Sequence, residues 1–181
     1  MQTYLALMRA INVGKRQMPM ADLRALAQEI GFMKPQTYIA SGNLIFDYHG
    51  SDAQVRETLE AAIEKRFGFA APTIVRKGTE WKHYCDTNPF DGDAQALDKM
   101  VHLCLTREPL KADAVDRLRE RALEWERIER VGDAIWIDFG SGGVANTKLT
   151  PAYMDKCAGS TLTARNWNSV RKLQAMIEAR G

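Results

Sequence analysis

The sequence predicts an α+β fold of two tandem ferredoxin-like units, each an antiparallel sheet with helices on one face. Within the first 77 residues, strand-like and helix-like apolar patterns follow one another in the order β-α-β-β-α-β. A similar succession begins again at residue 99, and the resemblance of MQTYLALMR to DKMVHLCLTR is suggestive. We therefore expect a ferredoxin-like unit at 1–78, a connecting helix and loop at 79–98, and a related second unit with a C-terminal helix at 99–181.

Each segment of the first half has its own boundary signal. TYLALMR is a compact apolar strand, and a Pro favours the first turn of the helix that follows it. The second helix begins with a capping box, in which a Ser and a Gln three residues later satisfy each other's backbone N–H groups. The predicted segments are a strand at 3–9, a helix from Pro19 to Gly31, two strands at 37–48 around a turn, a helix from Ser51 to Gly68, and a strand at 72–77.

The second half repeats part of this order. Gly132-Asp133 is a two-residue hairpin loop, and Thr150 is the expected N-cap of a helix beginning at Pro151. No strand is expected after the hairpin, so this half is predicted as β-α-β-β-α-α. Its segments, after a short helix at 79–90, are a strand at 99–106, a helix around 114–122, a hairpin at 126–140, a helix from Thr150 and a last helix from about Thr163.

Composition predicts a soluble cytoplasmic protein that has no membrane partner. The hydrophobic fraction is 45% and the charged fraction 27%, which are ordinary values. No apolar run approaches the ~18 residues that span a bilayer, and the N-terminus lacks a signal-peptide pattern. The three Cys are far apart and the three His are isolated, which fits neither a disulfide framework nor a metal site. We expect no cofactor, and no nucleophile signature assigns a reaction.

Positive charge gathers at the two ends of the chain. The net charge of +2 divides into +3 for residues 1–20, −5 for the middle and +4 for residues 142–181. Such ends can come together as one patch that attracts anions. We therefore predict a basic cleft between the two units.

The topology of the first unit predicts a polar rim. In a split βαβ unit the first two strands are parallel, so the first strand ends beside the turn that joins the second and third. Glycines there permit positive φ, and successive N–H groups form anion-binding nests. The predicted ligand-binding residues of this rim are Arg9, Asn12, Gly14, Lys15, Ser41, Gly42 and Asn43. The alternative for Ser41-Gly42-Asn43 is an ordinary turn in which Asn caps neighbouring backbone.

Two further segments are candidates for the same site. GSGGVANTKLTP leads through glycines toward a helix, with Lys148 nearby, and is either a phosphate loop or a flexible connection. TARNWNSVRKL places Arg165, Asn166, Trp167 and Asn168 at an expected helix start, where an anion would offset the unfavourable position of a cation. The alternative is that Trp167 belongs to the core and Arg165 pairs with an acid.

Four segments together resemble a bacterial family called domain of unknown function 1697. They are ALMRAINVGKRQMPMADLRAL, TYIASGNLIF, NTKLTPAYMDK and TARNWNSVRKL, and they extend over nearly the whole chain. Ala10 and Thr147 stand where the family usually has Gly and Ser. The resemblance implies two tandem α+β units and no known activity. The positions that match the family pattern are Arg9, Asn12, Gly14, Ser41, Gly42, Asn43, Lys148, Arg165, Asn166 and Trp167.

These observations favour one function and leave two alternatives. The favoured one is binding of a phosphate-bearing or carboxylate-bearing small ligand, which suits compact, Gly-rich, polar loops. The first alternative is single-stranded RNA, read through Tyr4, Tyr38, Phe46 and Tyr48, although the usual RNA-recognition signature is missing. The second is a homo-oligomer whose loops form an interface.

Overall fold

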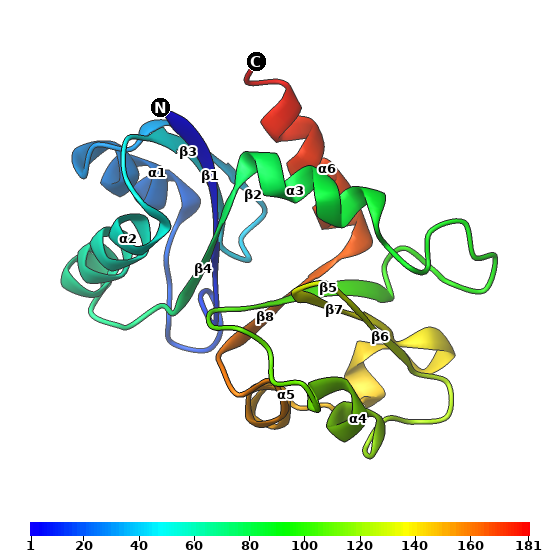
Figure 1. Ribbon diagram of the computed structural model, residues 1–181. Helices are drawn as coiled ribbons and strands as arrows, with labels where there is room; N and C mark the ends of the chain where they lie inside the picture. Colours follow the sequence, from blue (N-terminus) through cyan, green and yellow to red (C-terminus); the bar gives the residue numbers. More distant parts are fainter. The chain divides into compact units, whose positions relative to one another are not determined.

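The computed structural model describes residues 1–181, and the chain divides into two compact units (Figure 1). The first contains Met1–Trp81 and Ile177–Gly181, and the second contains Lys82–Met176. Each unit is built on a four-stranded antiparallel sheet. The α+β class and the two tandem ferredoxin-like units predicted from the sequence are confirmed.

The first unit has the predicted element order and the strand order β2-β3-β1-β4. This order is that of a split βαβ unit, in which β3 lies between the parallel strands β1 and β2. β2 begins earlier than the sequence indicates, because Pro35 and a bulge after Met33 are tolerated on an edge strand. The elements are β1 (Gln2–Met8), α1 (Met20–Glu29), β2 (Met33–Tyr38), β3 (Asn43–Tyr48), α2 (Asp52–Phe67) and β4 (Thr73–Lys77).

The core of the first unit lies between its sheet and the two helices, which cover the same face (Figure 1). Phe32 stacks on Phe46 with ring centroids 4.0 Å apart. α2 begins at the predicted capping box, where the Ser51 hydroxyl accepts from Gln54 N at 3.2 Å and the Gln54 side chain accepts from Ser51 N at 2.8 Å. Each fully buried large apolar side chain contributes roughly 1.5–3 kcal/mol, so this face of the sheet holds the unit together.

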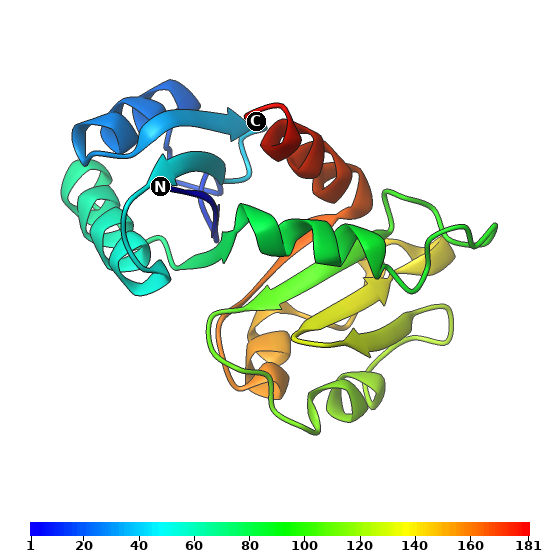
Figure 2. The ribbon, with the colours of Figure 1, turned by 45° about the horizontal axis from the view of Figure 1, so that its top comes forward.

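The second unit has the strand order β6-β7-β5-β8, with α4 and α5 on one face of its sheet (Figure 2). The predicted hairpin loop Gly132-Asp133 joins β6 to β7, and Thr150 caps α5 through Tyr153 N at 3.3 Å. Helix α3 (Gly78–Asp86) begins in the first unit and ends in the second. The elements that follow it are β5 (Val101–Thr106), α4 (Ala114–Arg119), β6 (Arg127–Val131), β7 (Ala134–Asp138), α5 (Pro151–Ala158), β8 (Leu162–Asn166) and α6 (Trp167–Glu178).

The prediction of a helix from Thr163 and of no closing strand is wrong. Residues 162–166 form β8, which pairs antiparallel with β5 from Thr106↔Leu162 to His102↔Asn166. α6 begins at Trp167, and Asn166 acts as its cap by accepting from Ser169 N at 2.9 Å. Residues 162–166 alternate only partly between buried and half-buried positions, and most of them are polar. The sequence therefore lacks the apolar alternation that indicates a strand.

The two halves of the chain follow one pattern, β-α-β-β-α-β-α. Leu5 lies between Ile45 and Arg76 in the first sheet, and Leu103 lies between Trp136 and Arg165 in the second. In both copies the fourth strand passes directly into a helix. The second half is thus a full repeat of the first.

Candidate anion-binding rim

The end of β1, the β2–β3 turn and the start of β4 lie together at one rim of the first sheet, as its topology predicts. Leu7 is opposite Asn43, and Met8 is opposite Thr73. Met8 N donates to Gly42 O at 2.8 Å, and Arg9 N donates to Pro72 O at 3.0 Å. We call loop 9–18 together with turn 39–42 the basic rim.

Loop 9–18 is held in a defined conformation by Asn12. Its amide donates to Met18 O at 3.0 Å and to Ala40 O at 2.8 Å, and its Oδ1 accepts from Met18 N at 2.7 Å. Asn12 has a φ of 53°, and Ala10 and Gly14 also have positive φ. Asn tolerates this left-handed backbone better than most residues. Asn12 therefore ties the loop to the β2–β3 turn, and its side chain is occupied by the protein.

The tip of the loop is a tight turn from Val13 to Arg16. Arg16 N donates to Val13 O at 3.2 Å, with Gly14 at φ 58°. Gly14, Lys15 and Arg16 are exposed, and neither cation forms an ion pair. The N–H groups of Gly14 and Lys15 have no protein acceptor. The turn thus presents two adjacent N–H donors and two unpaired cations to solvent.

The β2–β3 turn supplies the other side of the rim. Asn43 is fully buried, and its amide donates to Tyr38 O at 3.0 Å and to Ser41 Oγ at 3.1 Å. Gly42 has a φ of 82°, and a Cβ there would lie 2.8 Å from Ile11 Cδ1. Asn43 and Gly42 therefore shape the turn, while Ser41 is exposed.

Arg9 differs from the cations at the tip of the loop. It is half-buried at the end of β1 and already interacts with the protein. The guanidinium of Arg16 lies 5.9 Å from the Phe69 ring, in the segment before β4. The structure brings all seven predicted residues to this rim, and Gly14, Lys15 and Ser41 are the exposed ones among them.

The remaining predicted residues belong to the second unit. Arg165 is buried in β8, and one of its nitrogens donates to Thr163 Oγ1 at 2.8 Å and to Ala164 O at 2.9 Å. Burial lowers the pKa of Arg165 to about 10, so it stays charged at neutral pH. Trp167 is a core residue that packs edge-to-face on Trp136 at 5.6 Å.

Asn166 caps α6, as described above. Asn168 is exposed and accepts from the guanidinium of Arg171 at 3.0 Å, and Lys148 is exposed in the loop before α5. Both therefore lie at the surface of the second unit.

Packing explains two of the three glycines of GSGG, Gly140 and Gly142. A Cβ on Gly140 would lie 2.3 Å from Trp125 O, and one on Gly142 would lie 2.1 Å from Trp125 Nε1. Two short 3-10 turns, at Gly140–Gly142 and Val144–Asn146, lie between β7 and α5. The loop therefore reaches α5 through two short turns, and Gly140 and Gly142 lie close against Trp125.

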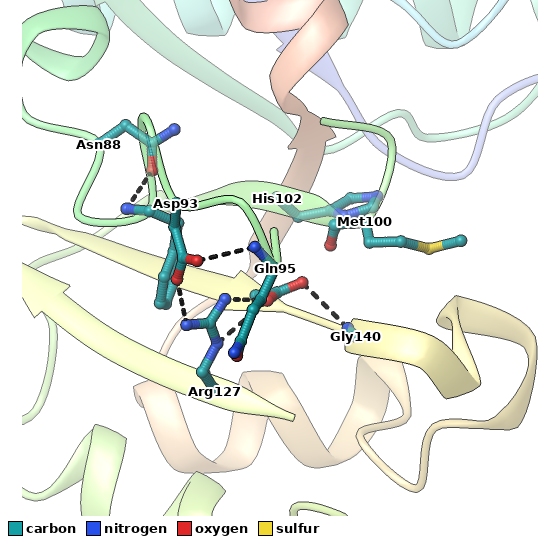
Figure 3. A network of polar contacts seen from close by, with 9 residues as sticks. Asn88, Asp93, Gln95, Met100, His102, Arg127 and Gly140 are labelled. Carbon is teal, nitrogen blue, oxygen red and sulfur yellow. Dashed lines mark hydrogen bonds and ion pairs between the residues drawn. The ribbon is translucent and has the colours of Figure 1, made fainter. Parts of the chain in front are cut away.

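Sequence reasoning missed a charged network in the second unit (Figure 3). Arg127 donates to Asp93 at 2.5 Å and, through two nitrogens, to Asp138 at 2.6 and 3.1 Å, and its guanidinium lies 4.9 Å from the Phe90 ring. These bonds raise the pKa of Arg127, and Arg127 lowers the pKa of Asp93. The repeat could have indicated this network. In the register of the two sheets, Asp138 has the same position in β7 as Asp47 has in β3.

A cavity of about 320 Å³ adjoins this network, but its charge does not suit an anion. Arg127 is its one cation and is already bound to Asp93 and Asp138. The carboxylate of Glu124 adds further negative charge. The cavity is lined by Gln95, Glu124, Trp125, Arg127, Asp138, Gly140 and Ser141.

The structure shows no group of side chains arranged for metal binding. Cys104 is fully buried, and burial raises its pKa to about 12, which leaves an unreactive thiol at neutral pH. Among the helices, none has the length and apolar character needed to cross a membrane.

Comparison with known proteins agrees with this architecture. The profile of a family described as "Protein of unknown function (DUF1697)" matches residues 1–136. The solved structure of a conserved bacterial protein from Streptococcus pneumoniae is similar, with a TM-score of 0.75, 25% identity, and coverage of 98% of this chain and 99% of that one. No curated protein matches significantly. The protein therefore belongs to the family of unknown function DUF1697.

Proposed function

We propose that the protein binds a small phosphate-bearing ligand, or another compact anion, at the basic rim of its first unit. The observation that carries this proposal is the turn at Val13–Arg16. There, two N–H groups without protein acceptors lie beside two cations without acidic partners. Successive N–H groups in such a turn form a concave anion-binding nest, and nearby cations strengthen it.

The chemistry of the side chains suits a phosphate group. Lys15 supplies a compact charge with three donors, and Arg16 supplies a planar fork that binds two oxygens at once. Residues 1–20 contain no acid to compete with a ligand. Ser41 is exposed on the adjoining turn, where its hydroxyl accepts from the Asn43 amide at 3.1 Å. We therefore assign ligand contact to Gly14, Lys15 and Arg16.

Rigidity of the loop favours binding. Asn12 makes hydrogen bonds to Met18 and Ala40, so the turn and its neighbour are fixed before a ligand arrives. A preorganised loop loses less conformational entropy on binding than a mobile one. Its left-handed residues hold a conformation that is costly for ordinary side chains, and such backbone is often kept at functional sites.

Single-stranded RNA has less support. Tyr4 and Phe46 are buried in the core beneath α1 and α2, where no base can stack on them. On the opposite face of the sheet, Leu5 and Ile45 are also buried. Tyr38 and Tyr48 are half-buried, and Tyr48 packs edge-on against Phe32. The first sheet therefore has less exposed aromatic surface than the sheets that bind RNA by stacking.

Isothermal titration with pyrophosphate and with nucleoside diphosphates tests the proposal. The wild type is compared with Lys15→Gln, Arg16→Gln and the matched control Lys65→Gln, which removes an exposed cation from α2 of the same unit. Charge-assisted hydrogen bonds contribute roughly 1.5–3 kcal/mol each, so each rim variant is expected to weaken binding about tenfold or more. The control should leave the affinity unchanged, and equal affinities in all four proteins would refute the site.

A further inference from the structure

The basic rim also carries exposed apolar side chains. Val13, at the start of the tight turn, is 56% exposed, and Ile39, in the adjoining β2–β3 turn, is 51% exposed. The two segments are in contact, because Asn12, next to Val13, donates to Ala40 O, next to Ile39. The basic rim thus carries exposed apolar residues as well as exposed cations.

The backbone of Ile39 makes this position unusual. Ile39 has a φ of 49°, in the left-handed region, and a β-branched residue there is a genuine outlier. Asn or Gly would fit this conformation with less strain. In the free protein Ile39 therefore costs stability in two ways. Its backbone is in a strained conformation, and its apolar side chain is exposed to water.

We propose that the anion bound at the basic rim is amphiphilic: a phosphate group joined to an apolar chain whose first methylenes lie against Val13 and Ile39. This inference rests on the proposed anion site and specifies its ligand class. Lys15, Arg16 and the N–H groups of the turn bind the phosphate, and the two apolar side chains lose contact with water when the chain covers them. The ligand accounts for both the charge and the strained apolar residue.

A series of n-alkyl phosphates provides the test. Ethyl, butyl and hexyl phosphate are titrated into the full chain below the concentrations at which they aggregate. Complete burial of a methylene strengthens binding by up to about fourfold, so affinity in the wild type should rise with chain length.

Two variants separate the apolar contact from the anion contact. In Ile39→Asn the rise with chain length should be lost or clearly reduced, while the affinity for ethyl phosphate, which has the least apolar surface, should change least. In Lys15→Gln all three ligands should weaken by a similar factor. The control Val144→Asn removes an apolar side chain that is 47% exposed in the second unit, and it should change nothing.

A thermal melt of the free Ile39→Asn protein is an independent readout. Because Asn tolerates the left-handed backbone, this variant should fold and should melt at the same or a higher temperature than the wild type. Together with a flattened chain-length series, that result would support a residue that is kept for binding. A variant that melts lower would contradict the view that Ile39 is strained in the free protein.

The apolar chain could belong to a soluble ligand or to a membrane lipid, and binding to lipid vesicles distinguishes the two. Co-sedimentation with phosphatidylglycerol vesicles but not with phosphatidylcholine vesicles identifies lipid, and alkyl phosphate binding without vesicle binding identifies a soluble ligand. If phosphates bind equally at every chain length, the amphiphile is refuted and the anion site remains. If no phosphate binds, the proposed function itself fails.

Discussion

Replacement of Arg180 by Ala is expected to destabilise the first unit strongly. Arg180 follows α6, and its guanidinium is paired with the carboxylate of Asp47 at 3.0 Å. It also donates to Lys34 O at 2.9 Å and to Gln36 Oε1 at 3.0 Å. The two charged side chains are only 6% and 7% exposed. Together, the ion pair with Asp47 and the bonds to Lys34 and Gln36 attach residues 177–181 to β3 and β2.

The expected loss follows from the burial of the pair. Removal of one partner of a buried ion pair costs roughly 3–5 kcal/mol, because the other charge is left without compensation. Asp47 keeps one donor, the hydroxyl of Thr3 at 2.8 Å. Residue 180 lies beyond the last turn of α6, and chain segments at helix ends open more easily than the core, so water should partly solvate the remaining carboxylate. We therefore expect about 3 kcal/mol, at the low end of that range.

Arg171→Ala is the matched control, because Arg171 also lies at the C-terminal part of the chain and pairs with an acid, Asp98. The side chains of that pair are 52% and 46% exposed. Exposed pairs contribute about 0–1 kcal/mol, so the two Arg→Ala changes differ chiefly in burial.

Urea unfolding measures both variants. With an m-value of about 2 kcal/mol/M, the midpoint of Arg180→Ala should fall by roughly 1.5 M. Amide hydrogen exchange in β2 and β3 should increase at the same time. If Arg180→Ala and Arg171→Ala shift the midpoint equally, by less than about 0.5 M, the buried pair does not exist in solution and the reasoning fails.

Three further changes have expected outcomes. Asn12→Ala removes hydrogen bonds to Met18 and Ala40, so it should cost about 2–3 kcal/mol and speed amide exchange in loop 9–18, an effect that Lys15→Gln should not have. Gly142→Ala places a Cβ against the Trp125 indole, and overpacking of this kind costs about 1–3 kcal/mol, measurable by urea unfolding with a change in native fluorescence. Burial lowers the pKa of His102, so the unfolded chain binds a proton first and stability should decline as pH falls below about 6.5. His102→Gln should remove that part of the decline.

Much of the fold is encoded locally, which is why the sequence predicted it. The capping box at Ser51, the N-cap at Thr150 and the hairpin loop Gly132-Asp133 each depend on residues close in sequence, and each is confirmed. The assembly of the basic rim was predictable as well, because it follows from strand order alone. The positive φ of Ala10 and Ile39 was not, since nothing in those residue types signals it.

The errors came from long-range pairing. The sequence predicts a helix at the position of β8 because Thr163 resembles an N-cap, and only the partner strand β5 gives Arg165 a place in a sheet. The pairs Arg180–Asp47 and Arg127–Asp93 join residues 133 and 34 positions apart. No local sequence pattern identifies such distant partners. The sequence therefore predicts that buried Arg side chains need acidic partners, but it does not show which acids these are.

The repeat gives a further reason to place function at the first unit. Arg9 and Arg107 follow the first strand of each copy, and both N–H groups donate at 3.0 Å to the segment before the fourth strand. The loop after Arg107 contains Glu108, and the hairpin turn at that rim contains Asp133, so acids accompany its cations.

Asp133 is also an acceptor for the Tyr84 hydroxyl, at 2.9 Å. The first copy has Lys15 and Arg16 at this rim and no acid in residues 1–20. Two copies with the same backbone thus differ in charge at corresponding rims. A requirement of the fold would affect both copies alike, whereas a ligand bound by one unit accounts for a cationic rim in that unit alone.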